Sequence, residues 1–209
     1  MTEDVAPLGR RERKKQALRA RIVLDCCTLI AELGVEGTKL DTLCDRVDIS
    51  KKTFYNYFDS KDTLLLEICQ SHLLTGMETA IETALASGAD CGTQLEMIFR
   101  ALFEGQADAG RFDLELIDYL VSNFASNRGA SIGLLDEMNG HYIRFFRHHR
   151  DVLRPEYTPE FCGEMAVGML VSVILNWMNH PDSDGAAKLP EVADYIRRSM
   201  LVDAGPGAG

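Results

Sequence analysis

Two common uses of cysteine are missing from this sequence. None of its six cysteines forms a C-x-x-C pair, and most of them fall inside apolar helical patterns. Buried, reduced thiols fit this distribution better than a zinc site or a disulfide framework. Cys91 stands apart because it falls in the expected loop SGADCG, so a redox-active thiol stays an alternative there. We expect no metal and no cofactor.

Long apolar runs are also missing. No stretch approaches the ~20 apolar residues that a membrane-spanning helix needs. The N-terminus is polar and basic and has no apolar segment of the secretory-signal type. We therefore expect a cytoplasmic protein with no membrane association.

A catalytic arrangement is absent as well. Serine, histidine and acidic residues occur, but they form no recognisable set of nucleophile and base. The cluster RHHR at 147–150 suggests a metal site, yet adjacent histidines on a helix point about 100° apart and cannot easily share an ion. A solvated helix end fits this cluster better, with cations favourably placed at the C-terminus. We do not expect an enzyme.

Positive charge is scarce and is concentrated at one end. The chain carries 22 Lys and Arg against 32 Asp and Glu, a formal net charge of -10. Between Gly9 and Arg21, however, seven basic residues stand against Glu12 alone. Basic side chains near DNA displace its condensed counterions, so this segment predicts an arm that contacts the DNA backbone. For Arg19 and Arg21 a solvated helix start is the alternative. The predicted DNA contacts of the arm are Arg10, Arg11, Arg13, Lys14 and Lys15.

Apolar periodicity predicts an all-α fold of roughly nine helices. The first helix should end at Gly34, a good C-cap residue. A helix-turn-helix domain is expected over residues 1–70 and a second helical domain over 71–209, with a disordered tail at 203–209. The later helices are expected at 39–47, 51–58, 61 onward, 93–105, 111–126, 131–150, 158–179 and 188–202.

The stretch DISKKTFYNYFDSKDTLL, residues 48–65, carries the clearest signals of local structure. Asp48 tolerates the left-handed conformation that a tight turn requires. Ser50 and Ser60 are each expected to cap the helix that follows, and Thr38 is expected to cap the helix at 39–47. Two short helices joined by the turn DIS predict a helix-turn-helix, whose second helix enters the DNA major groove.

The second helix of that motif has two distinct faces. Phe54 and Phe58 are four residues apart and should pack inward. The remaining side chains are hydrogen-bonding groups that suit phosphates and base edges. A solvated surface helix is the plainer alternative, but it explains the two tyrosines poorly. The outward residues are Lys51, Lys52, Thr53, Tyr55, Asn56 and Tyr57.

Together, the basic arm and the sequence AELGVEGTKLDTLCDRVDISKKTFYNYFDSKDTLLLEI resemble the tetracycline-repressor (TetR) family of transcriptional regulators. The resemblance covers about residues 12–70. It implies that Thr53, Tyr55 and Tyr57 touch DNA, and that Lys51, Lys52 and Asn56 set sequence preference. It also implies phosphate contacts by Lys61 and backbone contacts by Thr38 and Lys39. Cys44 and Asp48 depart from the family pattern, which has alanine and glycine there.

The same resemblance implies a small-molecule cavity in the second domain. Methionines and aromatic rings with a few polar tips suit an apolar effector. Most large apolar groups in this region must nevertheless be core. The candidate ligand contacts are Phe99, Phe103, Phe112, Leu116, Tyr119, Met138, Tyr142, Phe146, Met165 and Met169.

The last two expected helices resemble the dimerisation pair of the family. The run MAVGMLVSVILNWM is apolar nearly all round, which indicates one face on the core and another on a partner. We expect a homodimeric, ligand-responsive repressor of a palindromic operator in double-stranded DNA. The alternative is a DNA-binding regulator that acts through a partner protein without a small ligand. The candidate dimer contacts are Leu170, Ile174, Trp177, Val192, Tyr195 and Ile196.

Overall fold

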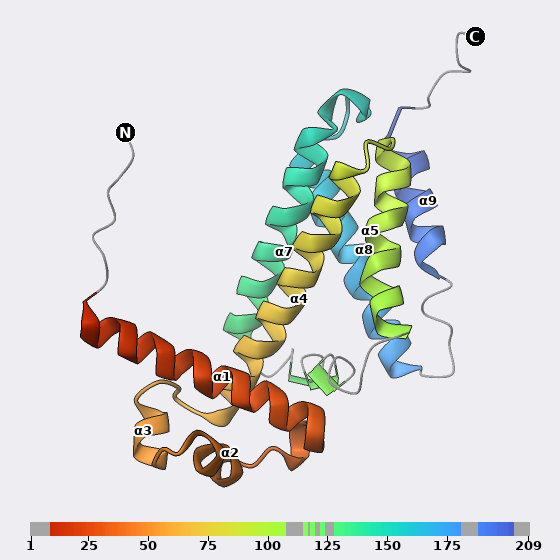
Figure 1. Ribbon diagram of the computed structural model, residues 1–209. Helices are drawn as coiled ribbons and strands as arrows, with labels where there is room; N and C mark the ends of the chain where they lie inside the picture. The colour runs from red at the N-terminus through yellow and green to blue at the C-terminus, as the bar shows by residue number, and fades with distance from the viewer. Residues whose placement is uncertain are drawn as a thin grey trace. The chain divides into compact units, whose positions relative to one another are not determined.

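The computed structural model describes residues 9–107, 115–116, 118–119, 122–123, 128–180 and 188–202, without the side chains of 103–107, 128–131 and 177–179. The all-α fold is confirmed, because these residues form helices with a single isolated β-bridge (Figure 1). The helices are α1 (Arg10–Gly37), α2 (Leu40–Val47), α3 (Lys51–Tyr55), α4 (Lys61–Ala86), α5 (Cys91–Ala107), α7 (Arg128–His148), α8 (Pro159–Asn179) and α9 (Lys188–Met200), with a 3-10 turn at Arg150–Val152.

Most of the expected local signals are confirmed. Asp48 is left-handed at φ 59° and ψ 54°, and Ser50 accepts a hydrogen bond from the Thr53 amide. Gly34 breaks α1 with φ 78°, although one further turn follows it. The capping prediction for Thr38 is wrong. Lys39 is the N-cap of α2, and Thr38 instead ends α1 by donating its hydroxyl to the Gly34 carbonyl at 2.8 Å.

The chain divides into two compact units. Unit 1 comprises residues 1–69 together with 110–116, and unit 2 comprises residues 70–109 and 117–209. In unit 1, α2 packs against both α1 and α3. Its interior holds apolar side chains from all three helices and from the start of α4. The most deeply buried of these are Ile22, Cys26, Ile30, Leu43, Phe54, Leu64 and Leu65.

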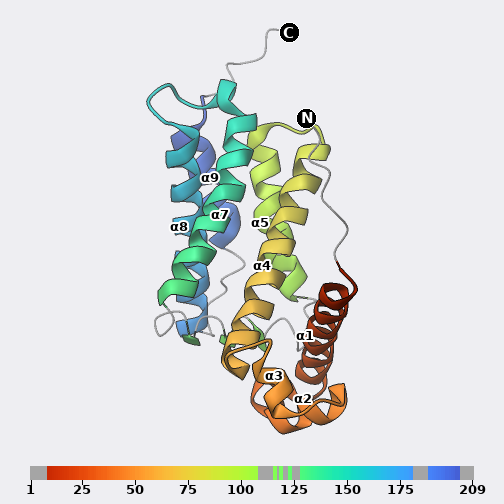
Figure 2. The same cartoon turned by 90° about the vertical axis from the view of Figure 1, so that its left-hand side faces the viewer.

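Unit 2 is built on close pairs of helices. Helices α7 and α8 lie side by side, and α9 packs against both α5 and α8 (Figure 2). Gly163 explains how closely α7 and α8 approach, since a Cβ at this position would lie 2.8 Å from the backbone nitrogen of Ile143. Leu153 and Leu201 form the isolated bridge, which joins the chain after α7 to the end of α9.

Several predicted ligand contacts belong to the core of unit 2. Phe99, Met138, Tyr142 and Phe146 are each at most 2% exposed, and the Phe99 and Tyr142 rings lie 6.1 Å apart. The Tyr142 hydroxyl and the Asn139 Oδ1 are buried and have no hydrogen-bond partner among the described residues, which is costly in an apolar interior. Tyr119, Met165 and Met169 are partly or fully exposed. Phe112 and the side chain of Phe103 lie outside the described residues.

The cysteines are reduced, and five of the six are buried. Cys91 is not in a loop, as the sequence pattern suggested, but begins α5 with a side chain that is 5% exposed. Burial raises the pKa of the Cys91 thiol to about 12, so the thiolate form needed for redox chemistry is strongly disfavoured. Burial therefore disfavours the redox alternative at this residue.

One expectation about apolar runs needs correction. Within α8, residues 159–176 reach a mean hydropathy of 1.2, and by length and composition alone this window is sufficient to cross a membrane. The helix lies against α7 and α9, and a third of the window is buried inside the protein. Core helices of soluble proteins have the same composition, so the window is weak evidence for a membrane span.

Candidate nucleic-acid interface

Helix α3 is anchored by its apolar side. Phe54 is fully buried and its ring lies 5.6 Å from that of Phe58, which is 3% exposed. The Ser50 hydroxyl bonds both the amide and the hydroxyl of Thr53, which starts the helix at a defined residue. The predicted inward orientation of the two phenylalanines is confirmed, and it forces the other side chains of this segment outward.

The outward face consists of donors and acceptors, as predicted. Lys52 and Asn56 are exposed, and Tyr55 is 52% exposed. The Tyr55 and Phe54 rings pack in a T-shaped arrangement with their centroids 5.5 Å apart. Thr53 and Tyr57 are half-buried at the border of the same face. The structure therefore brings together the six predicted side chains on one short segment. DNA contact by each of them remains a prediction.

Lys51 differs from its neighbours on this face. Its ammonium group lies 2.5 Å from Asp41 Oδ1 on α2. This hydrogen bond holds the pKa of Lys51 above its usual range. Lys39 and Lys52 are exposed, and neither forms an ion pair within the described part of the chain.

Two other residues predicted to contact DNA, Thr38 and Lys61, form contacts within the protein. Thr38 is fully buried, so its side chain is not available at the surface of unit 1. Lys61, at the start of α4, donates from its ammonium group to the Thr38 carbonyl at 2.9 Å. These contacts tie the junction of α1 and α2 to α4. A phosphate contact by Lys61 would have to use its remaining N–H donors.

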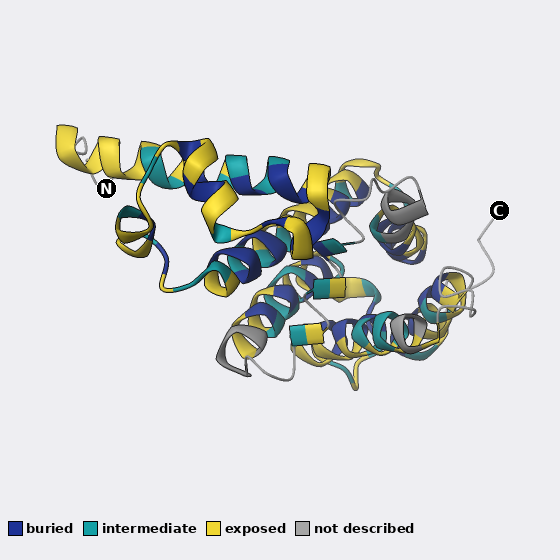
Figure 3. Cartoon of the chain, turned by 90° about the horizontal axis from the view of Figure 1, so that it is seen from below, coloured by how far each residue is buried: buried dark blue, intermediate teal, exposed yellow. Residues whose placement is uncertain are grey.

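The basic residues near the N-terminus lie on a helix and not on an extended arm. Helix α1 starts at Arg10, and its first turns are drawn in the colour of exposed residues (Figure 3). Arg19 and Arg21 behave differently from the earlier residues. Arg19 lies 2.6 Å from Glu67 and stacks over the Phe58 ring, and Arg21 pairs with Asp25 at 3.6 Å. The exposed set, which forms no ion pair with any described residue, is Arg10, Arg11, Arg13, Lys14 and Lys15.

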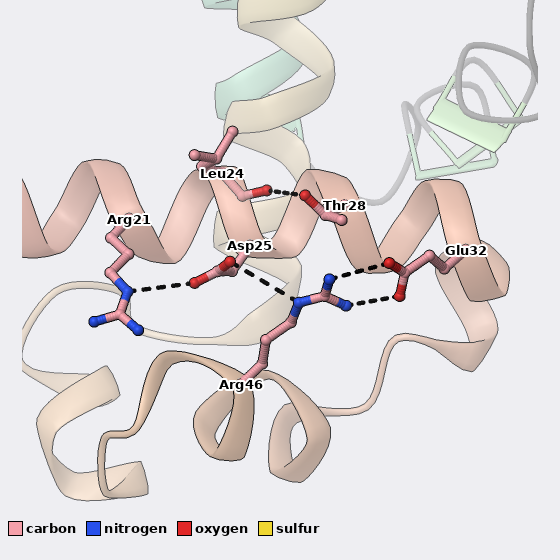
Figure 4. Close-up of polar contacts among 6 residues, drawn as sticks. All are labelled: Arg21, Leu24, Asp25, Thr28, Glu32 and Arg46. Atoms are coloured by element: carbon pink, nitrogen blue, oxygen red, sulfur yellow. Dashed lines mark hydrogen bonds and ion pairs between the residues drawn. The ribbon is translucent and has the colours of Figure 1, made fainter.

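Sequence patterns did not reveal the contact that joins α1 to α2. Arg46 donates two hydrogen bonds to Glu32, at 2.7 and 3.0 Å, and lies 3.9 Å from Asp25 (Figure 4). This bidentate pair lowers the pKa of Glu32. Glu32 and Arg46 are fourteen residues apart, so no helical spacing links them. Only the packing of α2 on α1 brings them together.

Glu115 adds a further contact within unit 1. Glu115 accepts a hydrogen bond from the Val35 amide at 2.9 Å, next to the Gly34 break in α1. Leu116 is 2% exposed and is grouped with unit 1, although it was a candidate ligand contact. Glu115 therefore helps to hold the end of α1.

Comparison with known proteins supports the same site. Residues 27–68 match the model of bacterial regulatory proteins of the tetR family, which includes α2, α3 and the start of α4. No curated protein matches the chain.

Solved structures share the fold over nearly the whole chain. The repressor FadR of Thermus thermophilus, solved with lauroyl-CoA, is 24% identical with a TM-score of 0.70, over 91% of this chain and 99% of that one. RolR, solved with resorcinol, is 19% identical with a TM-score of 0.68, over 92% of each chain. SmeT, which represses a multidrug efflux pump in Stenotrophomonas maltophilia, is 17% identical with a TM-score of 0.66, over 89% and 91%.

The matched residues are those that build the exposed face of α3 and its buried support. The resemblance inferred from the sequence is thereby confirmed: residues 27–68 match the tetR-family model, and the chain shares the all-α fold of TetR-family transcriptional regulators.

Proposed function

We propose that this protein is a homodimeric repressor that leaves its operator when a small molecule binds unit 2. The observation that carries the DNA-binding part is the exposed face of α3, which is held outward by Phe54 and Phe58. Side chains on such a helix reach base edges in the major groove, and a dimer reads two half-sites about one helical turn apart. The operator is therefore expected to be palindromic.

Operator selection from random duplexes tests this proposal. The selected sites should be two-fold symmetric, and Asn56→Ala should weaken binding to them more than to random DNA. An amide that reads an adenine edge contributes about 1 to 3 kcal/mol of discrimination. Tyr55→Phe, which removes a single exposed hydroxyl, is the milder comparison. Equal losses on selected and random duplexes would show that Asn56 does not read sequence.

The proposal that a small molecule binds unit 2 is supported by a groove between α4 and α5. Its volume is about 590 Å³, which lies in the usual range for ligand pockets. Four of the candidate ligand contacts, Phe99, Met138, Tyr142 and Phe146, are buried in the core, so we place effector contacts in this groove. Its walls are largely apolar with several threonine hydroxyls, which suits a small apolar molecule with a few polar groups. The lining residues are His72, Thr75, Gly76, Thr79, Ala80, Thr83, Ala84, Met97, Arg100 and Ala101.

Filling the groove should abolish the ligand response without affecting DNA binding. Thr79 is exposed and lines the groove, so Thr79→Trp places an indole there. Compounds from a panel of small aromatic and aliphatic molecules that raise the Tm of the wild type should leave this variant unchanged. Ser71→Trp is the matched control, because Ser71 is exposed on the same helix but does not line the groove. If both variants respond like the wild type, the ligand binds elsewhere; if no compound shifts the wild type, the partner-protein alternative is favoured.

The homodimer is supported by apolar side chains left exposed on α8 and α9. Phe161, Met165 and Tyr195 are 42%, 38% and 59% exposed. Ile174 and Val192 are half-buried, and the side chain of Trp177 lies outside the described residues. Leu170 and Ile196, by contrast, are at most 2% exposed within their own protomer. These two candidate contacts therefore pack in the protomer core, and we propose the exposed residues as the interface.

Met165→Glu should convert the dimer to monomers, because it would bury an unpaired charge in an apolar interface. Sedimentation velocity measures the change directly. Ile132→Glu is the matched control, since Ile132 is an apolar side chain that is 52% exposed on α7. A dimer that persists in Met165→Glu contradicts this interface.

A further inference from the structure

The pair between Asp41 and Lys51 lies on the surface that is proposed to meet DNA. Asp41 is in the first turn of α2, and Lys51 is the first residue of α3. Their side chains are 69% and 57% exposed, and the Lys51 Nζ lies 2.5 Å from the Asp41 carboxylate. The ion pair therefore joins α2 to α3 on the solvent-exposed surface of the helix-turn-helix.

A lysine in an ion pair has less to gain from DNA than an unpaired one. To contact a phosphate, Lys51 must leave a carboxylate of the same charge sign as the phosphate. The nearby Lys39 and Lys52, which form no ion pair with any described residue, have no such contact to give up. The carboxylate would also lie close to the phosphates if Lys51 moved away, and like charges repel.

Exposed ion pairs are weak, so whether Lys51 leaves Asp41 depends on the free energy of the phosphate contact that replaces the pair. One phosphate contact is itself modest and is weakened by salt. Because the ion pair and a phosphate contact have similar free energies, breaking the pair offsets most of the binding free energy that Lys51 would otherwise contribute. This effect applies to every duplex, because it does not depend on the base sequence.

We propose that Asp41 withholds Lys51 from DNA and thereby lowers the affinity of the protein for every duplex. The inference rests on the DNA-binding function proposed above. It revises the expectation that Lys51 sets sequence preference. Asp41 acts as a built-in competitor with the DNA backbone, and the affinity of the regulator is set partly by this one carboxylate.

Removing the carboxylate should tighten binding. The full-length Asp41→Asn protein is expected to bind a short duplex of random sequence several-fold more tightly than the wild type. Its affinity should also fall more steeply with salt, by up to about 0.9 in slope for each lysine that gains a phosphate contact. Fluorescence anisotropy between about 50 and 200 mM salt covers the range in which such changes are large.

Asp45→Asn is the matched control. Asp45 is exposed on α2, one turn after Asp41, and it forms no ion pair with any described residue. The substitution removes the same charge from the same helix but leaves Lys51 paired. It should therefore tighten binding less than Asp41→Asn. Thermal melts of all variants show whether the helix-turn-helix stays folded.

A double-mutant cycle with Lys51→Gln isolates the pair. Lys51→Gln should cost little affinity while Asp41 is present, and in the Asp41→Asn background it should reduce the gain to about that of Asp45→Asn. Equal costs in both backgrounds, or weaker binding by Asp41→Asn itself, would overturn the inference while leaving the DNA-binding function intact. A wild type that binds no duplex would instead contradict both.

Discussion

Phe54→Ala should abolish DNA binding because unit 1 unfolds. Phe54 is fully buried, and its ring contacts those of Tyr55 and Phe58. Removing a buried phenyl ring leaves a cavity and costs about 3 to 5 kcal/mol. Small domains are stable by only about 5 to 15 kcal/mol, so a large part of the stability of unit 1 is lost. Circular dichroism should show an early transition, which precedes that of unit 2.

Tyr55→Ala separates this effect from the loss of DNA contacts. Tyr55 is the next residue, but its side chain is 52% exposed, so the variant should melt close to the wild type. It should nevertheless bind DNA more weakly. If Tyr55→Ala melts early and Phe54→Ala binds DNA normally, the orientation assigned to α3 is contradicted.

Replacing the five basic residues at the start of α1 by glutamine should weaken binding to specific and random duplexes alike. These side chains are exposed and form no ion pair with the described residues, so they are available to phosphates. Each phosphate contact contributes about 0.9 to the slope of log affinity against log salt. The slope should therefore fall by up to about 4 or 5 for each subunit, and affinity near physiological salt should fall by orders of magnitude. The substituted residues are Arg10, Arg11, Arg13, Lys14 and Lys15.

A control at Arg19 and Arg21 distinguishes phosphate contacts from general charge. Arg19 already pairs with Glu67, and Arg21 pairs with Asp25. Replacing Arg21 by glutamine should change the salt slope far less than replacing an unpaired residue. Arg19→Gln should lower the Tm instead, since its guanidinium also stacks over Phe58 at 4.8 Å. Unchanged affinity and slope in the five-residue variant would remove the start of α1 from the interface.

Much of the fold is predictable from local sequence because the relevant interactions span only a few residues. The apolar spacing that places Phe54 and Phe58 on one face is a property of the helix itself. Ser50 and Ser60 cap their helices through amides three residues away, and Asp48 adopts the turn conformation that few other side chains tolerate. These signals, together with the basic cluster, were sufficient to identify a DNA-binding helix-turn-helix.

Two of the failures reflect burial, which helical spacing does not record. Thr38 is followed by a good helix pattern, yet its side chain is fully buried and its hydroxyl donates to the Gly34 carbonyl at the end of α1. Leu170 and Ile196 have the composition of interface residues but face the core of their own protomer. No spacing rule anticipates such choices, because a residue on an apolar helix can face either a core or a partner.

The sequence by itself determined most of the helices, the caps at Ser50 and Ser60 and the position of the α3 face that is proposed to meet DNA. Local hydrogen bonds and helical periodicity act within one or two turns, so they are encoded in adjacent residues. Only the tertiary structure decided which charged side chains already form ion pairs within the protein. The pairing of Arg46 with Glu32, and of Lys51 with Asp41, depends on how α2 lies against α1 and α3. The availability of a lysine for DNA is therefore a property of packing, since its competitor comes from another helix.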